Sequence, residues 1–190
     1  FQPEIFRLAD KKSDLQFLLG SDLRLTPRNL EKWDLTPETA AKCRRCGKHD
    51  VWEPLPGVTV ETFPSTDEGV AFLVTAEGRT VFHAGDLNWW HWEEEDDAYN
   101  RMMRGDYQKE IETLAGEKID LAFVVLDPRQ EEQFYWGFDW YMRHTDTKIV
   151  FPMHMWKQYE VQDRLIGMEV SEPYREKIMR IREMGQVFEL

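Results

Sequence analysis

A nearly continuous apolar run at residues 119–126, closed by Asp127 and Pro128, constrains the fold more than any other feature. A run of this length and composition is typical of a strand that is covered on both faces. Such a strand needs a layer of structure on each side of its sheet. The run therefore predicts a layered architecture built around a buried sheet.

From residue 58 onwards, the rest of the sequence alternates between the periodicity of strands and that of helices. Residues 58–63 alternate like a strand with one wet face, and residues 70–75 and 80–83 flank a hairpin turn. Apolar residues at helical spacing predict a helix over residues 99–114. Further expectations are an aromatic-rich helix over 131–144, a strand over 148–151, a helix within 174–190 and a terminal strand over 186–190. Hairpins and strand–helix alternation together favour a layered α/β fold over a purely doubly wound sheet.

The first third of the sequence has a different pattern of predicted elements. A helix is predicted from Pro3, followed by a short buried strand over residues 15–19 that ends at Gly20. Residues 23–57 have the character of an insertion, with helix starts at Thr26-Pro27 and Thr36-Pro37 and a stop for the second helix at Gly47. We expect one domain over residues 1–190 with this insertion inside it.

Composition excludes several classes of partner. The sequence has 24 basic and 36 acidic side chains, a formal net charge of −12, so nucleic acid and anionic lipid are not expected partners. No apolar stretch is long enough to span a bilayer, and no secretory signal is present. Two cysteines are too few for a disulfide framework, which favours a reducing cytoplasm. Because the sequence lacks an initiator Met, we expect it to begin inside a longer protein.

Two polar side chains follow predicted strands at similar positions. Asp86 ends the sequence His83-Ala84-Gly85-Asp86 after the strand at 80–83, and His154 follows the strand at 148–151. Ligands usually bind at this edge of an α/β layer. A carboxylate and an imidazole suit zinc, manganese or iron. The plainer interpretations are an Asp in a turn and a His satisfied as an ordinary polar group.

The order of these motifs resembles the metallo-β-lactamase superfamily, in its branch of broad metal-dependent hydrolases. The resemblance covers roughly residues 58–156 and rests on residues 69–74, 80–86, 120–123 and 152–154. It implies an αββα sandwich in which Asp86 bridges two metal ions and His154 completes the coordination of one. It also implies hydrolysis, with metal-activated water attacking an ester, lactone or phosphodiester type of small-molecule substrate.

The sequence departs from the family in two places. The signature His-x-His-x-Asp-His, which supplies most of the ligands, is absent, so we expect the N-terminal strands of the fold to be missing from this chain. A further family His is replaced around residues 65–67, where Asp67 is either a substitute metal ligand or part of an ordinary Asx-turn. A fragment with two ligands is expected to hold divalent metal weakly and to turn over little substrate.

Other side chains near the strand ends have two interpretations each. Trp89 and Trp90 are either a substrate wall or a packed loop that covers the site or makes a homodimer contact. Arg129 either binds a substrate anion or pairs with the acidic run at 93–97. His83 is expected to orient Asp86 or its loop rather than to bind metal.

Two further alternatives stay open at the level of sequence. Cys43 and Cys46 have the spacing of half a structural zinc site, or are inert thiols on one face of a helix over 37–46. The alternative to a metal-dependent hydrolase is a degenerate, non-catalytic member used for binding or assembly. A nuclease is disfavoured by the negative charge.

Overall fold

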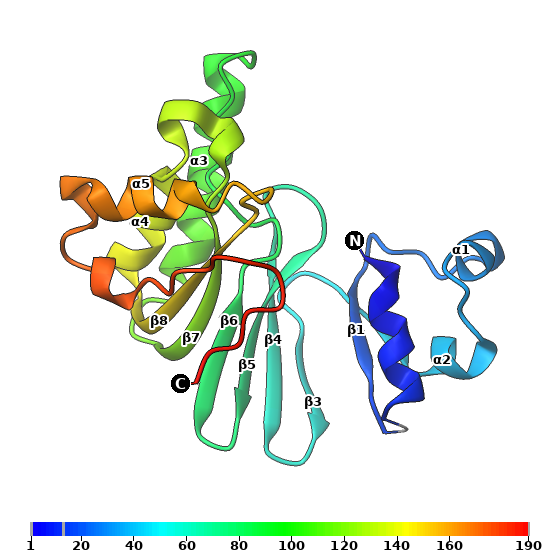
Figure 1. Ribbon diagram of the computed structural model, residues 1–190. Coiled ribbons are helices and arrows are strands. Elements are labelled where there is room, and N and C mark those ends of the chain that lie inside the picture. The colour runs from blue at the N-terminus through cyan, green and yellow to red at the C-terminus, as the bar shows by residue number, and fades with distance from the viewer. Residues whose placement is uncertain (1, 13, 190) are drawn as a thin grey trace.

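The centre of the fold is a six-stranded sheet, seen in a computed structural model that describes residues 2–12 and 14–189 (Figure 1). Its strands follow one another in chain order: β3 (Val51–Leu55), β4 (Val58–Pro64), β5 (Val70–Ala76), β6 (Arg79–His83), β7 (Lys118–Val125) and β8 (Asp146–Met153). The pairs from β3 to β6 are antiparallel, whereas β6–β7 and β7–β8 are parallel.

Helical crossovers produce the parallel half of the sheet. α3 (Asp97–Glu112), which the Asp96 side chain caps at the Tyr99 N–H, connects β6 to β7. η2 (Pro128–Gln133) and α4 (Trp136–His144) connect β7 to β8. As a result β6, β7 and β8 all end at the same edge of the sheet.

The main core lies between the sheet and these helices. Phe82 on β6 is fully buried and its ring stacks on Tyr141 of α4 at a centroid distance of 5.3 Å. Tyr107 of α3 is also buried, and its hydroxyl donates to the Gly137 carbonyl at 2.7 Å. The hydroxyl is thereby satisfied in an otherwise apolar layer.

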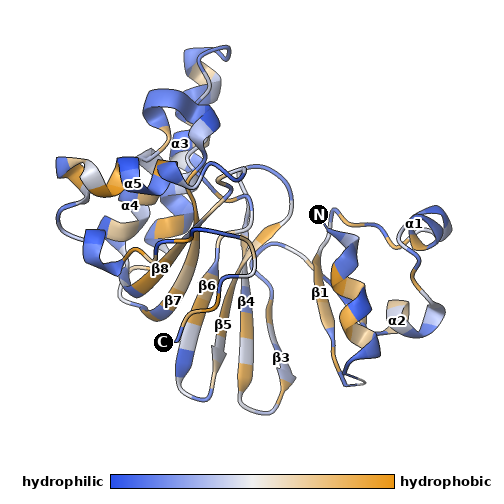
Figure 2. Cartoon of the chain, viewed as in Figure 1, coloured by the Kyte–Doolittle hydropathy of each residue, from blue (hydrophilic) through white to orange (hydrophobic). Residues whose placement is uncertain are grey.

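Apolar residues recur along the strands of the sheet (Figure 2), and on β7 and β8 some of them lie on the face opposite the helices. Phe123 and Phe151 stack there at 5.6 Å, and the C-terminal segment after η4 (Arg175–Lys177) crosses this face, with Phe188 against Phe151. A cavity of about 460 Å³ remains between this segment and the sheet. Both faces of β7 therefore carry apolar side chains, as the run at 119–126 predicts.

The first part of the chain forms an N-terminal lobe, defined as residues 3–46, beside the main sheet (Figure 1). It has its own small core around Phe6, Phe17, Leu19 and Leu35. Its elements are η1 (Pro3–Asp10), β1 (Phe17–Gly20), α1 (Pro27–Lys32), α2 (Pro37–Ala41) and β2 (Cys43–Cys46), with β1 and β2 paired in parallel. The insertion expected at 23–57 thus divides between this lobe and β3.

Most element predictions are confirmed, including the hairpin at 70–83, the helix over 99–114 and the capped starts of α1 and α2. Residues 43–46 form a strand, so the prediction of a helix that extends to Gly47 is wrong. Of the helix predicted within residues 174–190, only the short 3-10 helix η4 is present, and the terminal strand is absent from residues 186–189. Residue 190, the end of the expected terminal strand, lies outside the described residues. β3 and α5 (Glu160–Gly167) have no counterpart among the predictions.

Within residues 2–12 and 14–189, every helix is too short or too polar to span a bilayer.

Candidate metal centre

Two strand ends bring Asp86 and His154 together. Gly85, with φ of 57°, turns the chain after β6, and a Cβ at this position would lie 2.9 Å from the Val70 carbonyl oxygen. Only glycine fits this close approach without a shift of the backbone. His154 follows β8 directly and also has a left-handed backbone, with φ of 65°.

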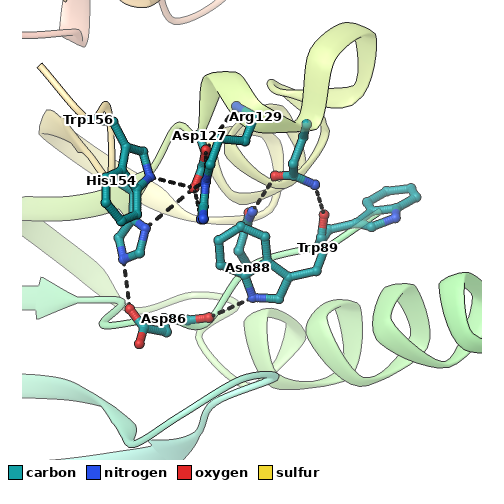
Figure 3. Close-up of polar contacts among 9 residues, drawn as sticks. Asp86, Asn88, Trp89, Asp127, Arg129, His154 and Trp156 are labelled. Atoms are coloured by element: carbon teal, nitrogen blue, oxygen red, sulfur yellow. Dashed lines mark hydrogen bonds and ion pairs between the residues drawn. The ribbon is translucent and has the colours of Figure 1, made fainter. Parts of the chain in front are cut away.

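The two side chains meet across the end of β7 (Figure 3). Asp86 Oδ1 and His154 Nε2 lie 2.7 Å apart. The bond to His154 lowers the pKa of Asp86, whereas Asp127 and Asp86 together raise the pKa of His154 to about 9. Each group stabilises the charged form of the other.

Asp127, at the end of β7, is the buried centre of this network. Its side chain is 0% exposed and accepts hydrogen bonds from Arg129 Nε at 2.9 Å, Arg129 Nη2 at 2.6 Å and Trp156 Nε1 at 3.2 Å. His154 Nδ1 lies 3.5 Å from Asp127 Oδ2, an ion-pair distance that is long for a hydrogen bond. Burial alone would raise the pKa of Asp127, but these donors hold it well below its usual value.

Comparison with known proteins shows what this arrangement is similar to. No family model and no curated protein matches the sequence. Among solved structures, CmlA, a diiron β-hydroxylase from Streptomyces venezuelae, matches with a TM-score of 0.54 and 11% identity over 87% of this chain and 38% of its own. At this level of identity, the likeness to CmlA shows a shared fold.

Two neighbours superpose less well. A Thermotoga maritima protein assigned to the metallo-β-lactamase superfamily as a zinc-dependent hydrolase has a TM-score of 0.35 and 18% identity over 59% of this chain and 49% of its own. Zn²⁺-bound PqqB from Methylobacterium extorquens has a TM-score of 0.40 and 14% identity over 83% and 61%. This chain therefore spans less than two thirds of each of these proteins.

The chain has a metallo-β-lactamase-like fold.

In this metallo-β-lactamase-like fold, Asp86 and His154 are suitable donors for a divalent metal. Among residues 2–12 and 14–189, however, no three His, Cys, Asp or Glu side chains are grouped closely enough to hold one. The described residues thus fit two positions of a metal site and do not complete it. The Asp67 N–H donates to Ser65 Oγ within a tight turn, and the Asp67 carboxylate is near enough to help raise the pKa of Arg129. Asp67 as a metal ligand stays a prediction.

His83 supports the turn that carries Asp86. Its Nδ1 accepts the Gly85 N–H at 3.0 Å, and its ring lies 5.5 Å from that of Phe123, on the face of the sheet opposite α3 and α4. Burial lowers the pKa of His83, which favours the neutral imidazole that this bond requires. The role of His83 in orienting Asp86 or its loop stays a prediction.

The two predicted tryptophans point in different directions. Trp90 is buried, donates its indole N–H to the Asp86 carbonyl at 3.0 Å and sets its ring edge-on to His154 at 5.9 Å. Trp89 turns away from Asp86 and His154 (Figure 3) and packs against Trp136 at 5.3 Å. The structure thus puts Trp90, but not Trp89, against the Asp86–His154 pair.

Arg129 pairs with Asp127, so the predicted salt bridge to the acidic run at 93–97 is wrong. Sequence reasoning also missed the roles of Asp127 and Trp156. Asp127 could have been found, because it follows a strand just as Asp86 does. Trp156 carried no such signal.

The cysteines do not form part of a metal group among the described residues. The Cys43 thiol donates to the Thr39 carbonyl at 3.4 Å, whereas Cys46 is buried. Residues three apart on a strand project to opposite faces, so the helical face expected for both thiols is wrong.

Proposed function

We propose that the full protein is a metal-dependent hydrolase and that this chain contributes Asp86 and His154 to its metal site. The observation that supports the proposal is the 2.7 Å approach of Asp86 Oδ1 to His154 Nε2 where β6 and β8 end. Two potential ligands from strands on either side of β7 face one point, at the edge where α/β layers bind ligands. The remaining ligands are proposed to come from residues other than those that the structure describes.

The network around His154 suits a metal ligand. A ligating imidazole usually has its second nitrogen held by a carboxylate, which fixes the ring and raises its basicity. Asp127 takes that place behind His154 Nδ1, and its other donors keep it ionised. Asp86 retains a second carboxylate oxygen, Oδ2, with which it could bridge two ions.

A bound divalent metal would supply an activated water for hydrolysis. In this scheme Asp86 and His154 hold the ion, Asp127 orients His154, and His83 holds the turn before Asp86. We propose zinc, with manganese or iron as alternatives, and an ester, lactone or phosphodiester type of small-molecule substrate. A cytoplasmic location and a homodimer are further proposals, and nucleic acid is not a proposed partner.

A specific observation favours one alternative, a degenerate member that binds or assembles without catalysis. Asp86 and His154 satisfy each other through their own ion pair, and the described residues offer no third ligand to them. A pair of this kind also stabilises a fold that has lost its metal.

Elemental analysis of the full-length protein separates the two functions. The variants Asp86→Ala and His154→Ala are compared with Asp163→Ala and His49→Ala, which remove a partly exposed Asp and an exposed His elsewhere. About two metal ions per chain are expected in the wild type and in both controls, with a loss in the two site variants. Wild-type protein without metal, or with metal that persists in both site variants, would refute the hydrolase proposal and leave the binding-domain alternative.

A further inference from the structure

The exposed indole of Trp156 lies beside the candidate site, in a segment with left-handed backbone conformations. Trp156 lies two residues after His154 and is 59% exposed. His154, Trp156 and Lys157 have φ values of 65°, 52° and 66°, in the left-handed region that residues other than glycine rarely adopt. Backbone of this kind is concentrated at ligand sites and active sites. The segment therefore holds Trp156 outward at a cost to the fold.

Arg129 lies between this indole and a second one. Its guanidinium carbon is 4.5 Å from the ring centroid of Trp156 and 5.6 Å from that of Trp92. Cation–π contacts of this kind hold a planar guanidinium against an aromatic wall. Asp127 binds Arg129 Nε and Nη2 and also accepts the Trp156 indole N–H, so one buried carboxylate fixes both side chains (Figure 3).

Part of the Arg129 guanidinium is available to bind a ligand. Within the described parts of the chain, Arg129 Nη1 makes no hydrogen bond, and the side chain is 46% exposed. A guanidinium can bind a carboxylate through one edge and a second oxyanion through another, because it has five N–H donors in one plane. Arg129 is linked to His154 through Asp127, which binds Arg129 Nε and Nη2 and lies 3.5 Å from His154 Nδ1.

We propose that Trp92, Arg129 and Trp156 form a binding site for a singly charged oxyanion carried on a flat apolar group. An aryl carboxylate is the simplest ligand of this class. Arg129 Nη1 would bind the oxyanion, while the two indoles would pack against the flat group. That this ligand is the substrate rests on the proposed hydrolase function. One negative charge fits better than several, because Asp127 already compensates Arg129 and the whole chain carries −12.

Nuclear magnetic resonance of ¹⁵N-labelled, EDTA-treated protein tests the site without metal or turnover. Benzoate is the probe, and benzyl alcohol and inorganic phosphate are the comparison compounds. Indole N–H signals are assigned with the variants Trp92→Phe and Trp156→Phe. Benzoate is expected to shift both indole signals with saturation, at a dissociation constant on the order of 1 mM. Benzyl alcohol, which lacks the charge, and phosphate, which lacks the flat group, are expected to bind more weakly.

Two variants and a matched control identify the residues. Arg129→Gln is expected to weaken benzoate binding by about tenfold or more, because a charge-assisted contact is lost. Trp156→Ala removes an exposed side chain and is expected to weaken benzoate binding while leaving phosphate binding unchanged. Arg164 is the control: it is also 46% exposed, lies 4.3 Å over the Phe134 ring and pairs with Glu132, so Arg164→Gln should bind benzoate like the wild type. Circular dichroism verifies that each variant is folded.

The site is refuted if benzoate binds no better than benzyl alcohol, or if Arg129→Gln and Trp156→Ala both retain wild-type affinity. An equal loss in Arg164→Gln would also refute it, since the effect would then be general. Metal content in Asp86→Ala and His154→Ala is a separate measurement. If the expected metal content is not found, the hydrolase proposal is refuted. If benzoate does not bind as expected, only the oxyanion site is refuted.

Discussion

Gly137 supports the loop that carries the candidate site, and replacing it by alanine should destabilise the protein. Gly137 lies in the first turn of α4, where a Cβ would come within 2.0 Å of Asn88 Oδ1 and 3.1 Å of the Trp89 backbone nitrogen. Asn88 is 2% exposed and donates to Gln130 Oε1 at 2.8 Å. The added methyl group therefore has to displace either a buried hydrogen-bonded amide or the helix.

The magnitude follows from three contributions. Overpacking a well-filled site costs about 1–3 kcal/mol. Breaking the bond between Asn88 and Gln130 leaves buried polar groups without partners, at about 1–3 kcal/mol. Alanine in a helix returns roughly 0.5–1 kcal/mol relative to glycine. Because the first two costs overlap, we expect the free energy of unfolding to fall by about 2–4 kcal/mol.

Gly105→Ala is the matched control. Gly105 lies within α3, and a Cβ there would meet no other atom within 4 Å. Only the helix term applies, so this variant should be more stable by roughly 0.5–1 kcal/mol. Urea unfolding followed by circular dichroism gives both values from the midpoints at an unchanged m-value. Shifts of the same sign in Gly137→Ala and Gly105→Ala would refute the close approach of α4 to Asn88.

Three further predictions concern charge and metal. Asp127→Asn should weaken metal binding by the full-length protein about 10–100-fold in a chelator competition, because His154 loses its orienting carboxylate; unchanged affinity would contradict that role. The pKa of Asp120, which the Lys148 ammonium lowers most, should be about 2 by carboxyl-carbon NMR and rise towards 3.8 in Lys148→Met. Its contribution to stability is then present above pH 3.8 and lost as the pH falls through about 2, so an unshifted Asp120 would contradict the Lys148 contact. The double variant Cys43→Ser/Cys46→Ser should keep the wild-type metal content by elemental analysis; a loss of zinc would show a site that the described residues do not form.

Local sequence patterns were sufficient to predict the strands and the helix around the candidate site. Periodicity located β4 to β8 and α3, and the rule that ligands gather where parallel strands end placed Asp86 next to His154. The hairpin at 70–83 was equally local, since its two strands are joined by a short turn.

Long-range pairing decided what local pattern could not. Residues 43–46 form β2 because they pair with β1, which is 26 positions earlier, and no short window of sequence contains that partner. A helix is predicted within residues 174–190, yet beyond η4 the Met179 N–H donates to the Val150 carbonyl and Phe188 packs on Phe151. Tertiary contacts with the sheet thus replace the helix.

The burial of Asp127 follows from strand order. Because β7 lies between β6 and β8, the residue that ends β7 is enclosed by the loops that carry Asp86 and His154. A carboxylate in that position is tolerated only when cationic and N–H donors surround it, and Arg129, Trp156 and His154 supply them. Of these three side chains, His154 belongs to the proposed metal site, and Arg129 and Trp156 belong to the proposed oxyanion site. One buried charge therefore positions both proposed sites, so its replacement should disturb metal binding and benzoate binding together, whereas Arg129→Gln should disturb benzoate binding most.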